Sequence, residues 1–361
     1  MRQVRINIFI VTVILLAIGT VMIYSASSAF AYESYGDSAY FLKKQLMFIC
    51  IGFVFAVFFM SFDYAKLRRF TKPFLLFSIL LLVAVFIPGI GKSAGGARRW
   101  IQLGPINFQP TEITKMALVF YTADLLSRKQ SEIKDFIYGF LPLVIILGLC
   151  IMLILAEPDL GTAVALGALI IIMAFIAGVD IKQLGMIIGP GILAVIGLIV
   201  ARPYRFRRIT AFFNPWNDPR GSGFQIIQSL IAIGSGGIFG VGLAHSKQKL
   251  FYLPEAHTDF IFSIIGEELG LIGTLSVVAL FVIFIWLGFR TAYSARDLFG
   301  QFLAYGLVTM LALQVLINIG AVTGSIPTKG LPLPFISYGG TSLVYSMMSV
   351  GLLLNIARHR R

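Results

Sequence analysis

Four carboxylates gather in the stretch LPEAHTDFIFSIIGEELG, at residues 253–270. They are Glu255, Asp259, Glu267 and Glu268, in a chain with 16 acidic residues among 361. An ionised carboxylate is costly to remove from water unless partners or solvent compensate, so their place at the start of a long apolar run needs a reason. A carboxylate at such a boundary can act as a general base, and Asp259 is the candidate.

For Asp259 the sequence leaves two interpretations open. In the first, Thr258 caps a helix and Asp259 lies in its positively polarised first turn, which stabilises the helix and lowers the carboxyl pKa without any catalysis. In the second, burial at the membrane boundary raises the pKa toward the operating pH, as suits a general base. Glu255 shares a face with Asp259 only if the helix begins that early. Glu267 and Glu268 lie two to three turns deeper, and we expect them to pair with buried polar groups.

A second polar group stands at the start of another apolar segment, in FQPTEITK. Glu112 and Lys115 are three residues apart there and so lie on one helical face. We expect an intramembrane ion pair that fixes packing, with a position on a cavity wall near Asp259 as the alternative. The preceding GGARRWIQLG offers Arg98 and Trp100, although anchoring at the membrane interface explains Trp100 equally well.

Two further motifs are typical of structural roles. AEPDLGTA, at 156–163, begins an apolar segment with a proline and acidic residues, as expected at a helix start. SIPTKGLPLPFISYGGTS, at 325–342, places prolines and a glycine pair around the last apolar segment, which indicates a rigid, irregular outer lid or a broken helix. Broken helices also line transport paths, so this motif does not separate an enzyme from a transporter.

The composition places all of these residues in a membrane protein. The chain is 58% hydrophobic and 12% charged, against roughly 25% charged in a soluble domain. Apolar stretches long enough to cross a hydrocarbon core of about 30 Å recur throughout, and the first, after MRQVR, is interpreted as a retained helix. The ten predicted spans, in one helical membrane domain over 1–361, are 8–28, 44–61, 73–91, 111–126, 137–156, 160–179, 183–200, 259–289, 299–323 and 336–357.

Cysteine and histidine usage argues against several classes of site. Cys50 and Cys150 lie inside apolar runs and imply no disulfide framework. His245, His257 and His359 are too scattered for a histidine metal site, so a metal would have to bind carboxylates or substrate phosphates. The net charge of +13 is explained by loop charges that orient a membrane protein, with no nucleic acid partner.

The loop charges also predict the orientation. With both termini in the cytoplasm, the inner connections and tails are rich in cations, as the positive-inside rule requires. These inner cations are Arg2, Arg5, Lys66, Arg68, Arg69, Lys72, Arg128, Lys129, Lys134, Lys182, Arg290, Arg296, Arg358, Arg360 and Arg361. The short outer connections hold Lys43, Lys44, Lys92, Arg98, Arg99 and Lys329.

Apart from Lys115, which falls within the span 111–126, the remaining cations lie in one long outer loop, 201–258. Its middle, GFQIIQSLIAIGSGGIFGVGL, is apolar, but counting it as a crossing would turn later basic connections outward. We therefore expect a segment that is re-entrant or lies at the interface, with glycines favouring irregular backbone. Long loops cross membranes whatever their charge, and that is the simpler explanation for these cations.

The alternative explanation is a site that faces outward and binds a phosphorylated or lipid-pyrophosphate ligand. Arginines grip phosphate oxygens bidentately, and lysines add point charges. The candidates are Arg205, Arg207 and Arg208 in YRFRRI, with Lys247 and Lys249 in HSKQK.

Taken together, these stretches resemble one family, the SEDS proteins of bacterial shape, elongation, division and sporulation. The matching stretches are GGARRWIQLG, QPTEITK, EPDLGTA, FNPWNDPRGSGFQIIQSL, LPEAHTDFIFSIIGEELG and PTKGLPLPFISYGGTS. They occur in the family's order over nearly the whole chain, and their wording is closer to the FtsW and SpoVE members than to RodA. One departure is Ala244, where relatives often have glycine.

The resemblance implies ten transmembrane helices in the bacterial cytoplasmic membrane and a peptidoglycan glycosyltransferase that polymerises lipid II at its outer face, in division or sporulation. It also implies a class B penicillin-binding protein as partner, with other divisome or elongasome membrane proteins. The family's essential aspartate corresponds to Asp259, and its conserved tryptophan to Trp100. A lipid II flippase and a non-enzymatic scaffold for the penicillin-binding protein are the alternative functions.

The implied mechanism combines these residues. Asp259 takes the proton of the acceptor 4-hydroxyl, while the loop cations stabilise the departing lipid pyrophosphate. A divalent cation, Mg²⁺ or Mn²⁺, is left open as a cofactor. Arg98, Trp100, Glu112, Lys115 and Glu255 complete the expected substrate-binding set.

Overall fold

The computed structural model describes residues 2–94, 97–103, 106–250 and 252–359. Gly95, Gly96 and Gly104 of the GGARRWIQLG motif, and Arg360 and Arg361 of the basic tail, lie outside the described residues. Each predicted apolar segment contains a helix, although in the segment 73–91 the helix ends at Ala84 and Gly91 begins a strand. These helices are α1 (Arg2–Tyr35), α2 (Tyr40–Ser61), α4 (Thr71–Ala84), α5 (Pro110–Arg128), α6 (Leu141–Ala156), α7 (Leu160–Ala177), α8 (Ile181–Val200), α11 (Ile261–Tyr293), α12 (Leu298–Val322) and α13 (Gly340–Ile356).

Shorter elements connect these helices. The helical ones are α3 (Tyr64–Leu67), η1 (Arg68–Phe70), η2 (Phe136–Phe140), α9 (Pro203–Phe213), η3 (Pro215–Asn217) and α10 (Phe224–Ser235). Between α4 and α5 the chain forms an antiparallel sheet, in the order β1 (Gly91–Ala94), β2 (Ala97–Leu103) and β3 (Ile106–Phe108). This small sheet was not anticipated in the all-helical prediction.

The chain is a multi-pass membrane protein. Within the described part of the chain, seven helices are long and apolar enough to cross a membrane: α1, α2, the continuous η2 and α6, α7, α8, α11 and α12. Helices α4 and α13 have 14 and 17 residues, and α5 carries several charges, so the count of ten crossings stays a prediction. Helix α10 has 12 residues, about 18 Å, which is too short for a crossing.

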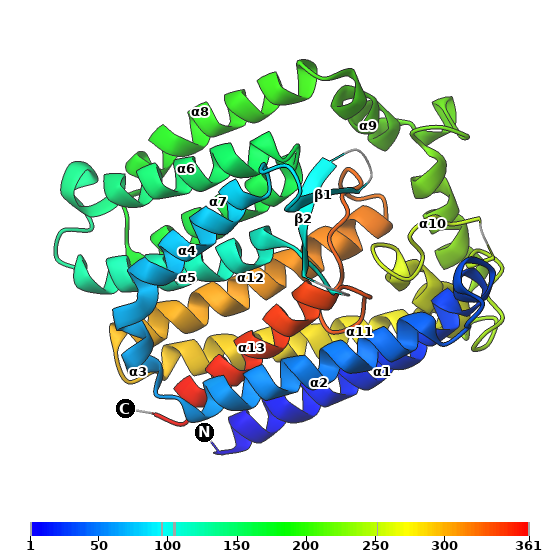
Figure 1. Cartoon of the computed structure of the whole chain (residues 1–361), viewed down its shortest axis with the longest axis horizontal. Coiled ribbons are helices and arrows are strands. Elements are labelled where there is room, and N and C mark those ends of the chain that lie inside the picture. The colour runs from blue at the N-terminus through cyan, green and yellow to red at the C-terminus, as the bar shows by residue number, and fades with distance from the viewer. Residues whose placement is uncertain (1, 95–96, 104–105, 251, 360–361) are drawn as a thin grey trace.

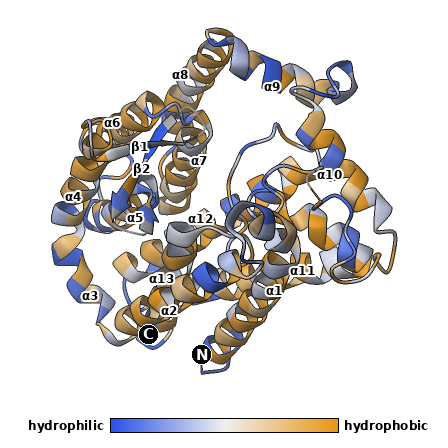
Figure 2. Ribbon diagram, turned by 45° about the vertical axis from the view of Figure 1, so that its right-hand side comes forward, coloured by the Kyte–Doolittle hydropathy of each residue, from blue (hydrophilic) through white to orange (hydrophobic). Residues whose placement is uncertain are grey.

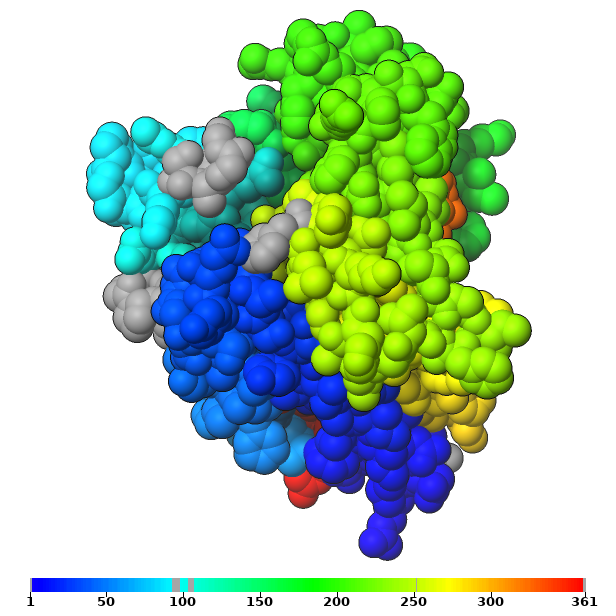
Figure 3. All heavy atoms as spheres, turned by 90° about the vertical axis from the view of Figure 1, so that its right-hand side faces the viewer, coloured from blue at the N-terminus to red at the C-terminus, as the bar shows by residue number. Residues whose placement is uncertain are grey.

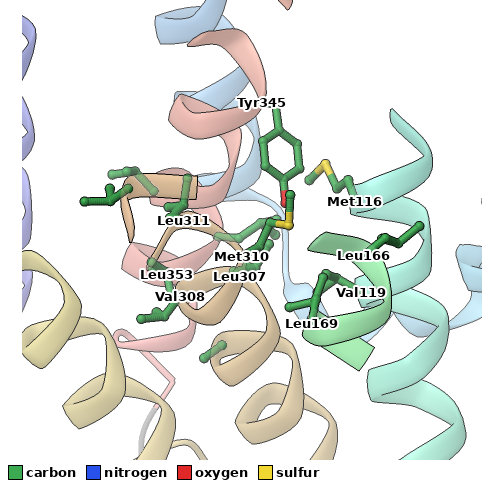
Figure 4. Close-up of a cluster of buried hydrophobic side chains, with 14 of the residues drawn as sticks. Met116, Val119, Leu166, Leu169, Leu307, Val308, Met310, Leu311, Tyr345 and Leu353 are labelled. Atoms are coloured by element: carbon green, nitrogen blue, oxygen red, sulfur yellow. The ribbon is translucent and has the colours of Figure 1, made fainter. Parts of the chain in front are cut away.

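The long helices run side by side, and both termini lie at one end of the bundle (Figure 1). The sheet, α9 and α10 lie toward the other end. A core of buried side chains from α5, α7, α12 and α13 joins the helices at the centre (Figure 4). The outer helix faces are also apolar (Figure 2), and on α8 Met186 and Leu193 are 66% and 70% exposed. Such exposure is expected of a surface that contacts lipid.

Helix α11 is broken at Gly270, which has φ 65° and ψ −162°. The glycine-rich segment 237–242 lies against the break and exchanges main-chain hydrogen bonds with 267–272. These bonds run from Val241 N to Glu267 O, Gly242 N to Glu268 O, Leu271 N to Gly237 O and Ile272 N to Ile238 O, at 2.9–3.2 Å. The loop thus satisfies backbone groups that the break would leave unpaired, as irregular backbone within a membrane protein requires.

Candidate active site

Asp259 lies in a turn before α11. The helix begins at Ile261, its N-cap residue Phe260 provides no side-chain cap, and the Thr258 hydroxyl donates to a carboxylate oxygen of Glu255 at 2.7 Å. The main-chain N–H groups of Thr258 and Phe260 both donate to the Glu255 carbonyl, which closes the turn. The interpretation in which Thr258 caps a helix and Asp259 occupies its first turn is therefore wrong.

Burial sets the charge state of Asp259. The side chain is only partly exposed, and burial raises its pKa to about 7. The carboxylate of Glu255 raises the pKa further, while Lys329 and Arg208 lower it. Desolvation therefore prevails, and Asp259 exchanges its proton close to neutral pH, as a general base should.

The segment 323–339, which we call the strap, connects α12 to α13 and packs on Asp259. A Cβ atom at Gly330 would overlap carboxylate oxygen Oδ2 of Asp259, so the strap backbone touches the carboxylate. The neighbouring Lys329 extends over Gly161, where a side chain would collide with it, and its ammonium lies 3.3 Å from Oγ1 of Thr162. The strap is irregular, as predicted for this motif.

Lys329 is the residue that sequence reasoning missed. Burial lowers its pKa to about 7, opposed chiefly by the carboxylate of Asp159. The charges of Lys115, Glu112 and Arg99 also act on it. Its only sequence signal is one basic residue among prolines and glycines, and the charge pattern predicts an ordinary outer-loop cation there.

The AEPDLGTA turn begins α7 as predicted. Asp159 is its N-cap and accepts hydrogen bonds from the Thr162 N–H at 3.0 Å and from the Thr162 hydroxyl at 2.8 Å. Arg99, on β2, donates to the main-chain oxygens of Glu157 and Pro158 at 3.0 and 2.6 Å. The sheet is thereby fastened to the turn that carries Asp159.

The Glu112–Lys115 ion pair is confirmed. Nζ of Lys115 lies 2.7 Å from a carboxylate oxygen of Glu112, and both side chains are almost fully buried. The ammonium also lies 5.8 Å from the centre of the Tyr345 ring. Because the charges of both residues act on Lys329, the pair also lies near the candidate site.

Two of the loop arginines, Arg207 and Arg208, line a pocket of about 480 Å³. It is lined by Pro203, Tyr204, Arg207, Arg208, Asp218, Gly221, Ser222, Gln225 and Thr328. Thr328 belongs to the strap, and Arg208 acts electrostatically on Asp259, so this pocket adjoins the turn that holds the carboxylate. Arg208 stacks on the Tyr204 ring at 4.6 Å, whereas Arg205 turns away and donates to the Leu198 carbonyl at 3.0 Å.

The two loop lysines have different environments. Lys249 is buried, and its ammonium contacts a carboxylate oxygen of Glu268 at 2.7 Å and the hydroxyl of Ser25 at 3.0 Å. The sequence predicts Lys249 as a phosphate ligand, but in the structure its ammonium is already engaged inside the protein. Lys247 has an exposed side chain, while its N–H donates to Glu267 at 2.9 Å. Glu267 and Glu268 are thus buried structural partners, as predicted.

The remaining predicted residues do not line this pocket. Arg98 is exposed on β2, and Trp100 on the same strand is partly buried opposite Lys92. Glu255 is exposed beside Asp259. Figure 3 shows this end of the molecule, where the sheet region (cyan), the first two helices (blue) and the 201–258 loop (green to yellow) share one face.

The described side chains provide few metal ligands. Among them, no group of three or more His, Cys, Asp or Glu residues could hold a metal ion. Asp259 and Glu255 together fit a divalent ion only if substrate phosphates supply the other ligands, which is the usual binding mode of Mg²⁺.

Comparison with known proteins identifies the family. The family model described as "Cell cycle protein", which covers FtsW, RodA and SpoVE, matches residues 5–361. Stage V sporulation protein E of Bacillus subtilis (strain 168) is 47% identical over 98% of this chain and 96% of its own length. A probable peptidoglycan glycosyltransferase FtsW of Geobacter sp. (strain M18) is 46% identical, with the same coverage. The chain therefore belongs to the FtsW, RodA and SpoVE family, as the sequence motifs predicted.

Two solved structures have the same fold. One, described as a peptidoglycan synthase complex in which polymerization and crosslinking are coordinated, aligns with a TM-score of 0.80 and 28% identity over 98% of this chain and 97% of that chain. The other is the rod shape determining protein RodA of Thermus thermophilus, with a TM-score of 0.73 and 25% identity over 98% of this chain and 96% of that one.

Proposed function

We propose that this protein is a peptidoglycan glycosyltransferase that polymerises lipid II at the outer face of the cytoplasmic membrane. The observation that carries the proposal is the partly buried Asp259, with a pKa of about 7, next to a pocket lined by Arg207 and Arg208. Relatives named as probable peptidoglycan glycosyltransferases FtsW match nearly the whole chain. A base beside a cationic pocket suits sugar transfer from a lipid pyrophosphate.

In the proposed reaction, the carboxylate of Asp259 accepts the proton of the acceptor 4-hydroxyl as its oxygen attacks the anomeric carbon of the donor glycan. The bond from that carbon to the pyrophosphate oxygen breaks, and undecaprenyl pyrophosphate leaves with the electron pair. Since pyrophosphate is a good leaving group, no second acid is needed, in contrast to ordinary glycoside hydrolysis. Lys329 lies beside the base and stabilises its charged form.

Arg207 and Arg208 are the proposed pyrophosphate ligands. Both line the pocket next to the strap, and a guanidinium can grip two phosphate oxygens at once. We include exposed Lys247 as a further cation, and we omit Lys249 because its ammonium pairs with Glu268. A divalent ion on the substrate phosphates would neutralise the same charge.

We further propose that both termini are cytoplasmic and that the 201–258 loop faces outward, following the charge bias of the connections. The proposed partner is a class B penicillin-binding protein that crosslinks the new glycan. The similarity to a solved synthase complex supports this partner.

The direct test is Asp259→Asn in purified protein with lipid II. We expect folding and lipid II binding to persist while glycan polymerisation is lost, because the amide cannot accept the proton. Substitution of exposed Asp37 by Asn is the control and should leave polymerisation intact. Normal glycan synthesis by the Asp259 variant contradicts the proposed mechanism. If the wild-type protein moves labelled lipid II across liposomes without forming polymer, the flippase alternative replaces the enzyme.

A further inference from the structure

Asn318, on α12, connects the Asp259 turn to the strap. Its side chain is 1% exposed, and Nδ2 donates to the main-chain oxygens of Asp259 at 2.8 Å and Leu331 at 2.7 Å. A carboxamide nitrogen carries two protons, so both are used by these carbonyls. One side chain therefore fixes two segments that lie far apart in the sequence.

This connection determines what touches the carboxylate. Leu331 follows Gly330, whose Cα is packed so closely on Asp259 that a Cβ would overlap Oδ2. Lys329 is the next residue back along the strap, and its charge acts on Asp259. When Asn318 holds the Leu331 carbonyl, it also holds Gly330 on the carboxylate and Lys329 beside it.

A second carboxamide, one turn earlier on α12, fastens the strap to a different element. Nε2 of Gln314 donates to the Pro332 carbonyl at 2.7 Å and to the Ser342 hydroxyl at 3.1 Å. This interaction joins the strap to α13 and involves no atom of the Asp259 turn. A main-chain hydrogen bond from Tyr338 N to His257 O, at 3.0 Å, also joins the strap to the Asp259 turn, at the far end of the strap. Asn318 makes the side-chain connection between that turn and the strap residue next to Gly330.

We propose that Asn318 is a positioning residue for glycan transfer, which sets the placement of Lys329 and Gly330 against the carboxylate of Asp259 through its two main-chain hydrogen bonds. The inference rests on the proposed function, because it concerns the same base. It assigns Asn318 no contact with substrate.

Asp259 and Lys329 each face charged groups from several elements. Asp259 faces Glu255 from its own turn, Lys329 from the strap and Arg208 from α9, and His257 lies in the same turn. Burial lowers the pKa of His257, so its ring is neutral at neutral pH. Lys329 faces Asp159 before α7, Glu112 and Lys115 on α5, and Arg99 on β2.

Asn355 provides a matched control. It is also a fully buried asparagine, on α13, and its Nδ2 donates to the main-chain oxygens of Phe59, Met60 and Phe62 at 2.7–3.0 Å. These carbonyls belong to the C-terminal end of α2, which lies near the C-terminus of the chain (Figure 1). Asn355→Leu therefore removes the same kind of interaction without touching the Asp259 turn.

The experiment compares Asn318→Leu and Asn355→Leu in the full-length protein, with lipid II as substrate over a range of pH. In Asn318→Leu we expect kcat to fall about tenfold or more, with KM nearly unchanged, because misplaced groups lower the rate of the chemical step. The acidic midpoint of the rate profile should move down by about half a pH unit, because water reaches a carboxylate whose pKa is raised mainly by burial. Asn355→Leu should keep the wild-type midpoint.

Hydrogen exchange separates this inference from the proposed function, because it does not require activity. In Asn318→Leu the amides of Lys329, Gly330 and Leu331 should exchange about tenfold faster than in wild type, whereas Asn355→Leu should leave them unchanged. If Asn318→Leu does not fold, Asn318→Ser, which keeps one donor, should give a smaller shift in the same direction. Unchanged strap exchange, or an unchanged midpoint in a polymerising variant, overturns the inference. Wild-type protein that makes no glycan instead refutes the proposed function.

Discussion

Asp259 shows where reasoning from residues reached its limit. Helix stabilisation and desolvation push the pKa of this carboxyl group in opposite directions, and the stretch HTDF is compatible with both. The deciding facts are that α11 begins two residues later and that the strap covers the carboxylate. The first depends on a local turn, and the second on a contact between residues 259 and 330.

The raised pKa of Asp259 predicts the pH dependence of glycan synthesis. A general base must be deprotonated, so the rate should rise through about pH 7, where half of the carboxyl groups are ionised. At one pH unit below that value we expect a rate about a tenth of the plateau. Initial rates with lipid II between pH 5 and 8, at saturating substrate, provide the measurement. A flat profile over this range is incompatible with Asp259 as the base.

Glu157 predicts a second pH effect, on stability. Burial raises its pKa to about 8, Asp159 adds to the increase, and Arg99 opposes it. The folded protein therefore keeps a proton that the unfolded chain loses near pH 4.5, so this residue makes stability fall as the pH rises from about 4.5 to 8. Glu157→Gln should have nearly wild-type thermal stability at pH 5 and a higher melting temperature than wild type at pH 8.

Asp37→Asn is the control for Glu157→Gln, because the pKa of Asp37 is shifted in the opposite direction. A hydrogen bond from Lys43, with others, lowers the pKa of exposed Asp37, so this carboxylate stabilises the fold above its unfolded pKa. Neutralising it should bring no gain at pH 8. If Glu157→Gln and Asp37→Asn shift the melting temperature alike at both pH values, the buried acid is not the cause.

At the scale of elements, the hydrophobic segments and the irregular strap were predicted well, whereas the small sheet and the break in α11 were not. The apolar runs became helices because their length and composition suffice for a membrane helix. The sheet over 91–108 escaped prediction because its strands have 4, 7 and 3 residues and are interrupted by glycines. The break in α11 was hidden because a single glycine such as Gly270 is tolerated within a helical pattern, and no proline marks the position.

The break predicts that substitution of Gly270 lowers the stability of the fold. Its φ of 65° is unfavourable for other residues, and a Cβ there would overlap backbone atoms of Gly240 and Ile238. Gly270→Ala should therefore cost about 1–3 kcal/mol from strain alone, with a further loss from the overlap, and lower the melting temperature by several degrees. Gly185→Ala, on α8, is the control.

A Cβ at Gly185 meets no atom within 4 Å, and alanine is the better helix former, so this control should leave the melting temperature unchanged or slightly higher. Thermal unfolding in detergent compares the two variants. Equal stability of both would mean that the 237–242 segment does not rest on the break.

At the scale of the whole molecule, the site is assembled from parts that the sequence keeps separate. Asp259, Glu112 and Lys115 could be selected as candidates because each is a charge in an apolar context. Their relation to Lys329 could not be predicted, since it requires α5, the α7 start, the Asp259 turn and the strap to meet. Lys249 was misjudged for the same reason, because its partner Glu268 lies on another element.

The orientation of the whole bundle gives the last prediction. Cationic connections favour the cytoplasm, so the end that carries both termini should be inside and the end that carries α9 and α10 outside (Figure 1). In a background of Cys50→Ser and Cys150→Ser, we place single cysteines at two exposed positions, Asn217→Cys before α10 and Ser131→Cys after α5. An impermeant maleimide on intact cells should label the first and reach the second only after permeabilisation. The reverse pattern inverts the topology, and labelling of both in intact cells would require a different number of crossings between α5 and α10.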